Sequence, residues 1–195
     1  KTGILICVFT ECTHHGDRTR SRLMLCESAD RGRTWSPKHP LGEYAPNGHD
    51  FDNCARITTL DDGTLIVICD HQVGENERVA RSFDRLWFSH DNGVSWDGPH
   101  MTPVTGIVPD KYRVLSNGRH IISTHTYSKI TGKLEQSLWY SDDQGQTWSN
   151  PVIVASDPRY NLCEGSILET KSGALVCFLR ENSGLGIDCL KTISY

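Results

Sequence analysis

The sequence lacks two features that would indicate a membrane or a nucleic-acid partner. No stretch of the 195 residues approaches the roughly 18 consecutive apolar residues of a membrane-spanning helix, and residue 1 opens no leader or lipidation motif. Lysine and arginine number 20 against 24 aspartates and glutamates, a net charge of −4 with neutral histidines. Nucleic-acid-binding domains usually present a basic face. We therefore expect neither a membrane nor a nucleic acid as partner.

The cysteines have neither the density nor the spacing of a disulfide scaffold or a zinc site. Eight cysteines in 195 residues are too few for a small disulfide scaffold, and no pair has the CxxC spacing of a structural zinc site. The histidines show no HxH or HxxxH spacing, so we predict no metal site and no cofactor. Cys7, Cys69 and Cys177 lie in apolar, β-rich runs and are expected to be buried free thiols. This usage favours a reducing compartment such as the cytoplasm.

An internal repeat organises the chain. The motif Ser-x-Asp-x-Gly-x-Thr/Ser-Trp occurs three times, over residues 28–35, 89–96 and 141–148. Its chemistry predicts a tight turn, because the aspartate can accept hydrogen bonds from backbone N–H groups ahead of it and the glycine adopts a positive φ. The tryptophan then covers the hairpin with a large apolar face.

A second repeat precedes each motif and sets the fold class. A glycine-containing turn followed by an apolar run occurs at Gly3, Gly63, Gly118 and Gly173. Short strands separated by turns, with no helical period, predict an all-β protein. Each unit has the strand order of a four-stranded antiparallel β-propeller blade. We place complete blades at residues 37–103 and 104–158, and partial blades at residues 1–36 and 159–195.

The three motifs are the Asp-box, or BNR, signature, and the chain resembles the sialidase (neuraminidase) superfamily of propellers over essentially all 195 residues. The resemblance implies six blades, of which this chain supplies about three and a half. It also implies that the remainder of a longer chain, or a second copy, closes the ring. In this superfamily the boxes lie on the rim, away from the active centre, so their aspartates are expected to be structural.

The resemblance assigns candidate catalytic residues. Glu164 matches the family's glutamate strand, and Arg180, sixteen residues on, matches an arginine of the triad that binds the sialic-acid carboxylate. In the family that glutamate polarises a tyrosine nucleophile. Asp17, in the loop after the first apolar strand, matches the acid/base aspartate. The other arginines and the tyrosine are expected outside residues 1–195. The alternatives are a solvated glutamate at Glu164, a surface ion pair at Arg180 and an ordinary turn at Asp17.

The glycine repeat predicts a set of substrate-binding residues. Seven residues after Gly63, Gly118 and Gly173 come Asp70, His125 and Arg180, each at the end of an apolar run. In a propeller such strand ends line the mouth of the central funnel, although strand ends are also ordinary places for polar residues. The full set of expected substrate-binding residues is Arg180, Asp70, His125, His71, His49 and Arg56.

The nine histidines support a second hypothesis. Some propellers of this build are polysaccharide lyases that act on uronic acids, which need an arginine to neutralise the carboxylate and a histidine or tyrosine to remove the C5 proton. Here His49 or His71 would be the base, Arg180 or Arg56 the neutralising group, and Tyr112 the acid. A third hypothesis is a non-catalytic glycan-binding propeller. All three hypotheses predict a glycan as the partner.

Overall fold

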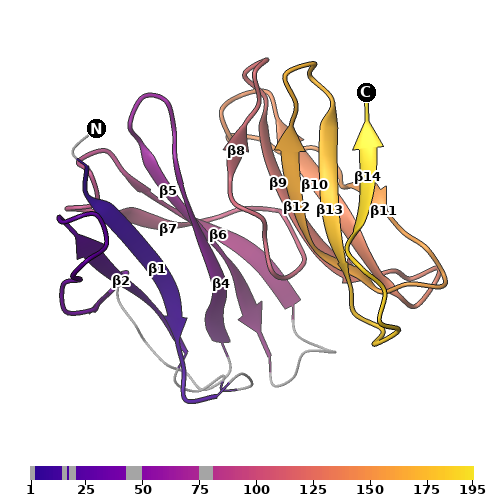
Figure 1. Ribbon diagram of the computed structural model, residues 1–195, viewed down its shortest axis with the longest axis horizontal. Helices are drawn as coiled ribbons and strands as arrows, with labels where there is room; N and C mark the ends of the chain where they lie inside the picture. The colour runs from indigo at the N-terminus through magenta and orange to yellow at the C-terminus, as the bar shows by residue number, and fades with distance from the viewer. Residues whose placement is uncertain (1–2, 15–16, 18–20, 43–49, 75–80) are drawn as a thin grey trace. The chain divides into compact units, whose positions relative to one another are not determined.

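The computed structural model describes residues 3–14, 17, 21–42, 50–74 and 81–195 (Figure 1). All regular elements in these ranges are β-strands, which form four antiparallel sheets, so the predicted all-β class is confirmed. The chain divides into two compact units, residues 1–102 and 103–195, and each unit is described by itself. No helix in the described ranges is long and apolar enough to cross a membrane.

The first unit holds a three-stranded sheet of order β1-β2-β3 and a four-stranded sheet of order β4-β5-β6-β7. Within each sheet, every strand pairs with the next strand in the chain, which is the predicted blade order. The strands are β1 (Leu5–Glu11), β2 (Arg22–Ser28), β3 (His39–Pro40), β4 (Asp50–Thr59), β5 (Leu65–Val73), β6 (Arg81–Ser89) and β7 (Asp97–Met101).

The second unit repeats this arrangement with a four-stranded sheet, β11-β10-β9-β8, and a three-stranded sheet, β12-β13-β14. The strands are β8 (Arg113–Val114), β9 (His120–Tyr127), β10 (Leu134–Ser141), β11 (Val152–Ala155), β12 (Leu162–Glu169), β13 (Leu175–Glu181) and β14 (Leu190–Ser194).

Each unit has an apolar core between its two sheets, because alternate side chains of a strand point to one face. The first eight residues of β5 are buried. This strand is therefore covered on both faces, and Asp70 and His71 near its end are held in a packed strand. The core of the first unit contains Leu23, Leu25, Leu41, Ala55, Val67, Cys69 and Trp87. That of the second unit contains Ile121, Leu138, Ile167, Cys177 and Leu179.

The three predicted cysteines do not share one environment. Cys69 and Cys177 are buried, as predicted, but Cys7 is exposed and that prediction was wrong. The reason is the pleat of β1: Ile6 and Val8 pack against the core of the first unit, so Cys7, between them, points to the opposite face.

The three box motifs form equivalent turns. In the third, the Ser141 hydroxyl donates to Asp143 Oδ1 at 2.7 Å and accepts the Gly145 N–H at 2.8 Å, while the Thr147 N–H donates to Asp143 Oδ1 at 2.8 Å. The same bonds recur in the turns over 28–35 and 89–96. Hydrogen bonds from the Thr147 hydroxyl and N–H, then from Ser141, lower the pKa of Asp143 to about 2. These aspartates are thus engaged in holding turns.

Candidate functional site

One backbone irregularity recurs in both units. The pairing of β4 with β5 and of β12 with β13 is interrupted by a register shift, and a residue within each shift has a positive φ, Cys54 at 51° and Glu164 at 50°. Val108, in the segment before β8, has a φ of 51°. Non-glycine residues seldom adopt this left-handed conformation, and bulges that contain it are found next to functional sites.

The residue before each of these three positions pairs with a residue that the glycine repeat singled out. This pairing places Asp70, His125 and Arg180 at one equivalent point in three sheets, which agrees with their common offset in the sequence. The register partners are Asn53 with Asp70, Ile107 with His125, and Cys163 with Arg180.

The bulge in β12 brings the two strongest candidates together. Arg180 Nη1 donates to Glu164 Oε1 at 2.6 Å, the ion pair that was the alternative interpretation of Arg180. Regular pleating would place Glu164 on the face opposite to Cys163, the register partner of Arg180, and the bulge re-aims its side chain. The Arg180 side chain is 55% exposed and that of Glu164 is 40% exposed, so an external ligand can reach both.

Buried side chains of the neighbouring sheet hold this bulge. His125 Nδ1 accepts the Glu164 N–H at 3.2 Å, and Gln136 Oε1 accepts the Gly165 N–H at 3.0 Å. His125 is 4% exposed and Gln136 is fully buried, and Gln136 Nε2 donates to Ser123 Oγ at 2.7 Å. A bulge leaves backbone N–H groups without strand partners, and these side chains supply acceptors to two of them.

The protonation state of His125 follows from its surroundings. Burial lowers its pKa to about 4, with the Glu164 carboxylate acting in the opposite direction and Arg180 in the same direction as burial. His125 is therefore neutral at pH 7. Its Nδ1 accepts the Glu164 N–H, so the ring proton is on Nε2.

A second polar network lies at the end of β5 in the first unit. His71 Nδ1 is 2.9 Å from Asp52 Oδ1, and Arg85 Nη2 is 2.9 Å from His71 Nε2. Arg85 Nη1 also donates to Asp52 Oδ1 at 3.3 Å. Because a guanidinium only donates, His71 Nε2 accepts and Nδ1 donates to the carboxylate. Both ring nitrogens of His71 are thus engaged, which does not suit a general base.

Sequence reasoning missed Arg85, although strand alternation could have indicated it. Arg85 is the register partner of Cys69, two residues before His71 on β5. Residues diagonal to each other on paired strands share a face and lie within reach of a long side chain.

Asp70 lies in the interior of its sheet. It is fully buried, and Gln72 Nε2 donates to its Oδ2 at 2.6 Å. Its register partner Asp84 is also fully buried, and within the described part of the chain neither oxygen of that carboxyl has a hydrogen-bond partner. Burial, followed by the charge of Asp70, raises the pKa of Asp84 well above its usual range. Sequence analysis did not single out Asp84.

Two candidates make contacts typical of local structure. Asp17 Oδ2 accepts the Thr13 N–H at 3.1 Å and the Thr13 hydroxyl at 2.5 Å, the turn role that was its alternative interpretation. Arg56 Nη1 donates to the carbonyl oxygens of Cys54 and Ala55, at 3.2 and 3.0 Å, and so caps the bulge of its own strand.

Tyr112 does not fit the role of acid. It is 1% exposed, its hydroxyl is 2.5 Å from His120 Nδ1, and its ring meets that of Trp148 edge-on. Burial raises its pKa. Tyr112 therefore packs against the third box turn, out of reach of a substrate. His49 lies outside the described residues.

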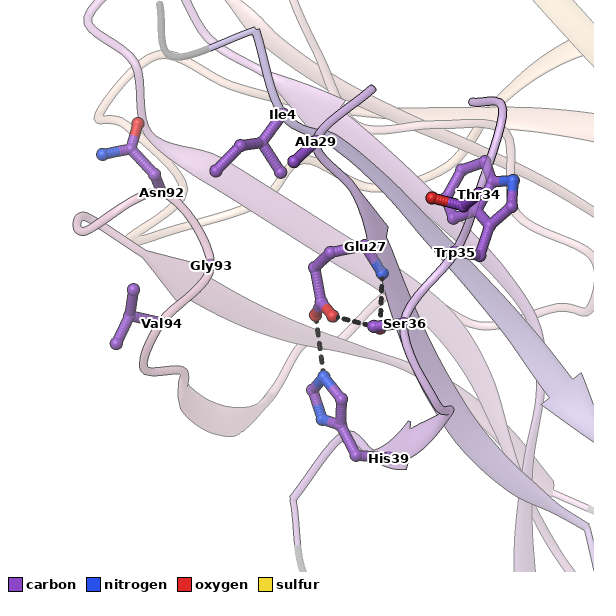
Figure 2. Close-up of a pocket in the computed structure, with 10 residues that line it drawn as sticks. All are labelled: Ile4, Glu27, Ala29, Thr34, Trp35, Ser36, His39, Asn92, Gly93 and Val94. Atoms are coloured by element: carbon purple, nitrogen blue, oxygen red, sulfur yellow. Dashed lines mark hydrogen bonds and ion pairs between the residues drawn. The ribbon is translucent and has the colours of Figure 1, made fainter. Parts of the chain in front are cut away.

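The first unit also contains a groove of about 600 Å³ (Figure 2). On one wall Glu27 Oε1 is 2.7 Å from His39 Nε2, and the Ser36 hydroxyl donates to Glu27 Oε2 at 2.7 Å. The facing wall comes from the second box turn. The lining residues are Ile4, Glu27, Ala29, Thr34, Trp35, Ser36, His39, Asn92, Gly93 and Val94, and no candidate site residue is among them.

The chain is similar to a known family and to solved structures. A family model described as a BNR repeat-like domain matches residues 45–193. A protein of unknown function from Dyadobacter fermentans is 24% identical, with a TM-score of 0.77 over 100% of this chain and 63% of that one. A sialidase from Streptococcus pneumoniae is 13% identical, with a TM-score of 0.71 over 99% of this chain and 48% of that one.

An α-L-arabinanase from Penicillium chrysogenum, solved with arabinobiose, is 16% identical, with a TM-score of 0.63 over 98% of this chain and 59% of that one. The chain thus spans about half to two thirds of the length of these three proteins. At such low identities the likeness shows the fold. The antiparallel sheets are blades of a β-propeller, as predicted.

Proposed function

Because this chain belongs to the family of BNR repeat-like domains, we propose that it forms part of a glycoside hydrolase similar to exo-sialidases, which hydrolyses the terminal glycosidic bond of an acidic sugar. The observation that carries this proposal is the exposed Glu164–Arg180 pair on a bulge that buried side chains hold. The structural likeness to a sialidase supports it.

The chemistry of the pair suits an acidic sugar. A guanidinium can donate two parallel hydrogen bonds to a planar carboxylate, and more than half of the Arg180 side chain is open to solvent. A substrate carboxylate that binds Arg180 competes with Glu164 for it. Glu164 is then free to accept a proton from, or polarise, the attacking nucleophile. We assign the acid/base role to Asp17 on the family resemblance alone, since its described side-chain contacts are those of a turn.

The two other hypotheses differ in their support. The lyase hypothesis has less support. Both ring nitrogens of His71, its candidate base, are engaged, and Tyr112, its candidate acid, is buried. A glycan-binding propeller without catalysis would use the same arginine, and only turnover separates it from a hydrolase.

Three readouts on the purified 195-residue chain distinguish these functions. Fluorophore release from an aryl sialoside reports hydrolysis, an absorbance rise from an unsaturated uronate reports a lyase, and ligand-detected NMR with a sialoside reports binding. Since the family's other arginines and its tyrosine are expected outside residues 1–195, binding is the primary readout. We expect the sialoside to bind, and Arg180→Ala to weaken binding by about tenfold or more, the loss of a charge-assisted contact.

Arg119→Ala is the matched control, because Arg119 Nε forms a similar exposed pair with Asp142 Oδ1 at 2.7 Å. It should leave binding unchanged. Glu164→Gln should preserve binding and lower any turnover. No binding of an acidic sugar, or an equal loss with Arg119→Ala, would contradict the proposal.

A further inference from the structure

The imidazole of His125 carries a hydrogen-bond donor that no described residue uses. Its Nδ1 accepts the Glu164 N–H at 3.2 Å, so the ring proton lies on Nε2. Within the described part of the chain Nε2 has no hydrogen-bond partner, although the residue is only 4% exposed. Nε2 is also not among the unpartnered atoms that are sealed from solvent. A buried donor of this kind costs free energy unless an acceptor from outside completes it.

Tyr127 presents an aromatic ring on the same face of the same strand. It follows His125 by two residues on β9, so the pleat directs both side chains to one face, with their Cα atoms about 7 Å apart. Tyr127 is 65% exposed. A tyrosine offers a ligand a flat apolar face and a polar hydroxyl, and a sugar ring likewise has an apolar face and a rim of hydroxyls. An aromatic ring with an N–H donor nearby therefore suits an uncharged sugar.

This face of β9 lies beside the Glu164–Arg180 pair. β9 and β12 are neighbours within the second unit (Figure 1), and the bond between His125 and Glu164 joins them. Because the next sheet of the chain already packs against this face of β9, further blades that close the ring would add no strand against it. The exposure of Tyr127 is therefore not that of an open blade end.

Local hydrogen bonds fix the hairpin that carries Tyr127. The Ser128 N–H donates to the Lys133 carbonyl oxygen at 2.8 Å and closes the turn. Leu134, the register partner of Tyr127, donates its N–H to Asn161 Oδ1 at 2.9 Å. This bond ties the hairpin to the segment that leads into β12. The aromatic ring is thus carried on an ordered turn before a ligand arrives, which lowers the cost of binding.

We propose that His125 and Tyr127 form a second sugar subsite, which takes the neutral sugar to which the acidic sugar at Arg180 is linked. The His125 Nε2–H donates to an oxygen of that sugar, and the Tyr127 ring stacks on its apolar face. This inference rests on the proposed function, because Arg180 binds the first sugar. Arg180 then selects the acid, whereas His125 and Tyr127 select what the acid is linked to.

The test compares two ligands of the 195-residue chain by ligand-detected NMR titration. Methyl α-sialoside has the acidic sugar alone, and sialyllactose adds neutral sugars to it. We expect sialyllactose to bind more tightly. Tyr127→Ala should raise the Kd for sialyllactose about two- to tenfold, the usual worth of an aromatic contact, and leave that for methyl α-sialoside unchanged. Tyr127→Phe should retain most of the affinity, since it keeps the ring.

Tyr195→Ala is the matched control, because Tyr195 is also an exposed tyrosine, and it should change neither Kd. Arg180→Ala should weaken the binding of both ligands, which separates this proposal from the proposed function. If methyl α-sialoside binds through Arg180, but Tyr127→Ala affects sialyllactose no more than Tyr195→Ala does, the second subsite is wrong and the proposed function stands. If neither ligand binds, both are wrong.

The unsubstituted chain gives a second readout, which does not depend on the folding of a variant. Long-range proton–nitrogen correlation spectra report the Nε2 of a neutral histidine, and His125→Asn assigns the signal. Sialyllactose should shift the His125 Nε2 resonance, and methyl α-sialoside should shift it much less. An equal shift with both ligands, or none with either, would show that His125 does not contact the linked sugar and would overturn the proposal.

Discussion

Replacing Gly165 with alanine tests how firmly the β12 bulge is held. A Cβ at this position would lie 2.6 Å from Gln136 Cδ and 2.9 Å from its Cγ, closer than real Cβ contacts allow. Gln136 is fully buried and bonded to Ser123, so it cannot move aside freely. Overpacking of this kind costs about 1–3 kcal/mol, and weakening the Gly165–Gln136 hydrogen bond costs about 0.5–1.5 kcal/mol more. We expect a loss of about 2–4 kcal/mol in the free energy of unfolding.

Thermal and urea unfolding, followed by tryptophan fluorescence, measure this loss. For a chain of this length 1 kcal/mol shifts Tm by about 2–4 °C, so the expected decrease is about 4–16 °C. The decisive comparison is Gly165→Ala in a Gln136→Ala background, where the atoms that clash are gone. The substitution should then cost at least about 1 kcal/mol less than in the unsubstituted chain, a coupling that a double-mutant cycle resolves.

Gly173→Ala is the control for conformational cost. A Cβ at Gly173 meets no atom within 4 Å, but the φ of this residue is +86°. The Gly173→Ala substitution should lower the free energy of unfolding by about 1–2 kcal/mol. This cost should be the same with Gln136 or Ala at position 136. If Gly165→Ala costs the same in both backgrounds, steric contact with Gln136 is not what fixes the bulge, and the reasoning fails.

Two further predictions concern pH and the box turns. Burial lowers the pKa of His125 from 6.5 to about 4, so the unfolded chain binds more protons between these values. The stability is fully present above pH 6.5 and falls as the pH drops toward 4, by up to ~3 kcal/mol. Denaturant titrations from pH 4 to 7 should show this slope, and it should vanish in His125→Asn, which retains an acceptor for the Glu164 N–H. An unchanged slope in that variant would assign it to other groups. In the box turns, alanine at Ser28, Ser89 or Ser141 removes the acceptor of a glycine N–H and should cost about 1–2 kcal/mol in each case. The Ser28 and Ser141 losses should add in the double variant, as expected for separate sites, and clear non-additivity in urea unfolding would show that the turns are not independent.

Much of the fold could be predicted because turn chemistry is local. The aspartate, glycine and hydroxyl residues of each box make their hydrogen bonds within four residues. The glycine turns also fix register, since a hairpin turn sets which residues face each other. For this reason the offset of seven residues from Gly63, Gly118 and Gly173 identified structurally equivalent positions at Asp70, His125 and Arg180.

The hydrogen bonds that hold the β12 bulge could not be predicted, because they join segments that lie far apart in the sequence. Glu164 and His125 are 39 residues apart in the chain, and Gly165 and Gln136 are 29 apart. In the sequence Gln136 resembles any polar residue of a strand, and only its burial shows its role. The exposure of Cys7 was missed for a related reason, since an apolar run does not indicate which of its faces meets a core.

The same left-handed backbone conformation recurs at three equivalent points that carry different residue types. A cysteine, a valine and a glutamate adopt a φ of 50–51° at equivalent points, Cys54, Val108 and Glu164. None of these residue types favours the left-handed region, and valine, being β-branched, favours it least. The surrounding structure must therefore impose the conformation whichever residue stands there. It follows that the fold sets the direction in which the side chain points, and that the residue type sets its chemical reactivity. Only at Glu164 does this position carry a carboxylate, and there it meets Arg180.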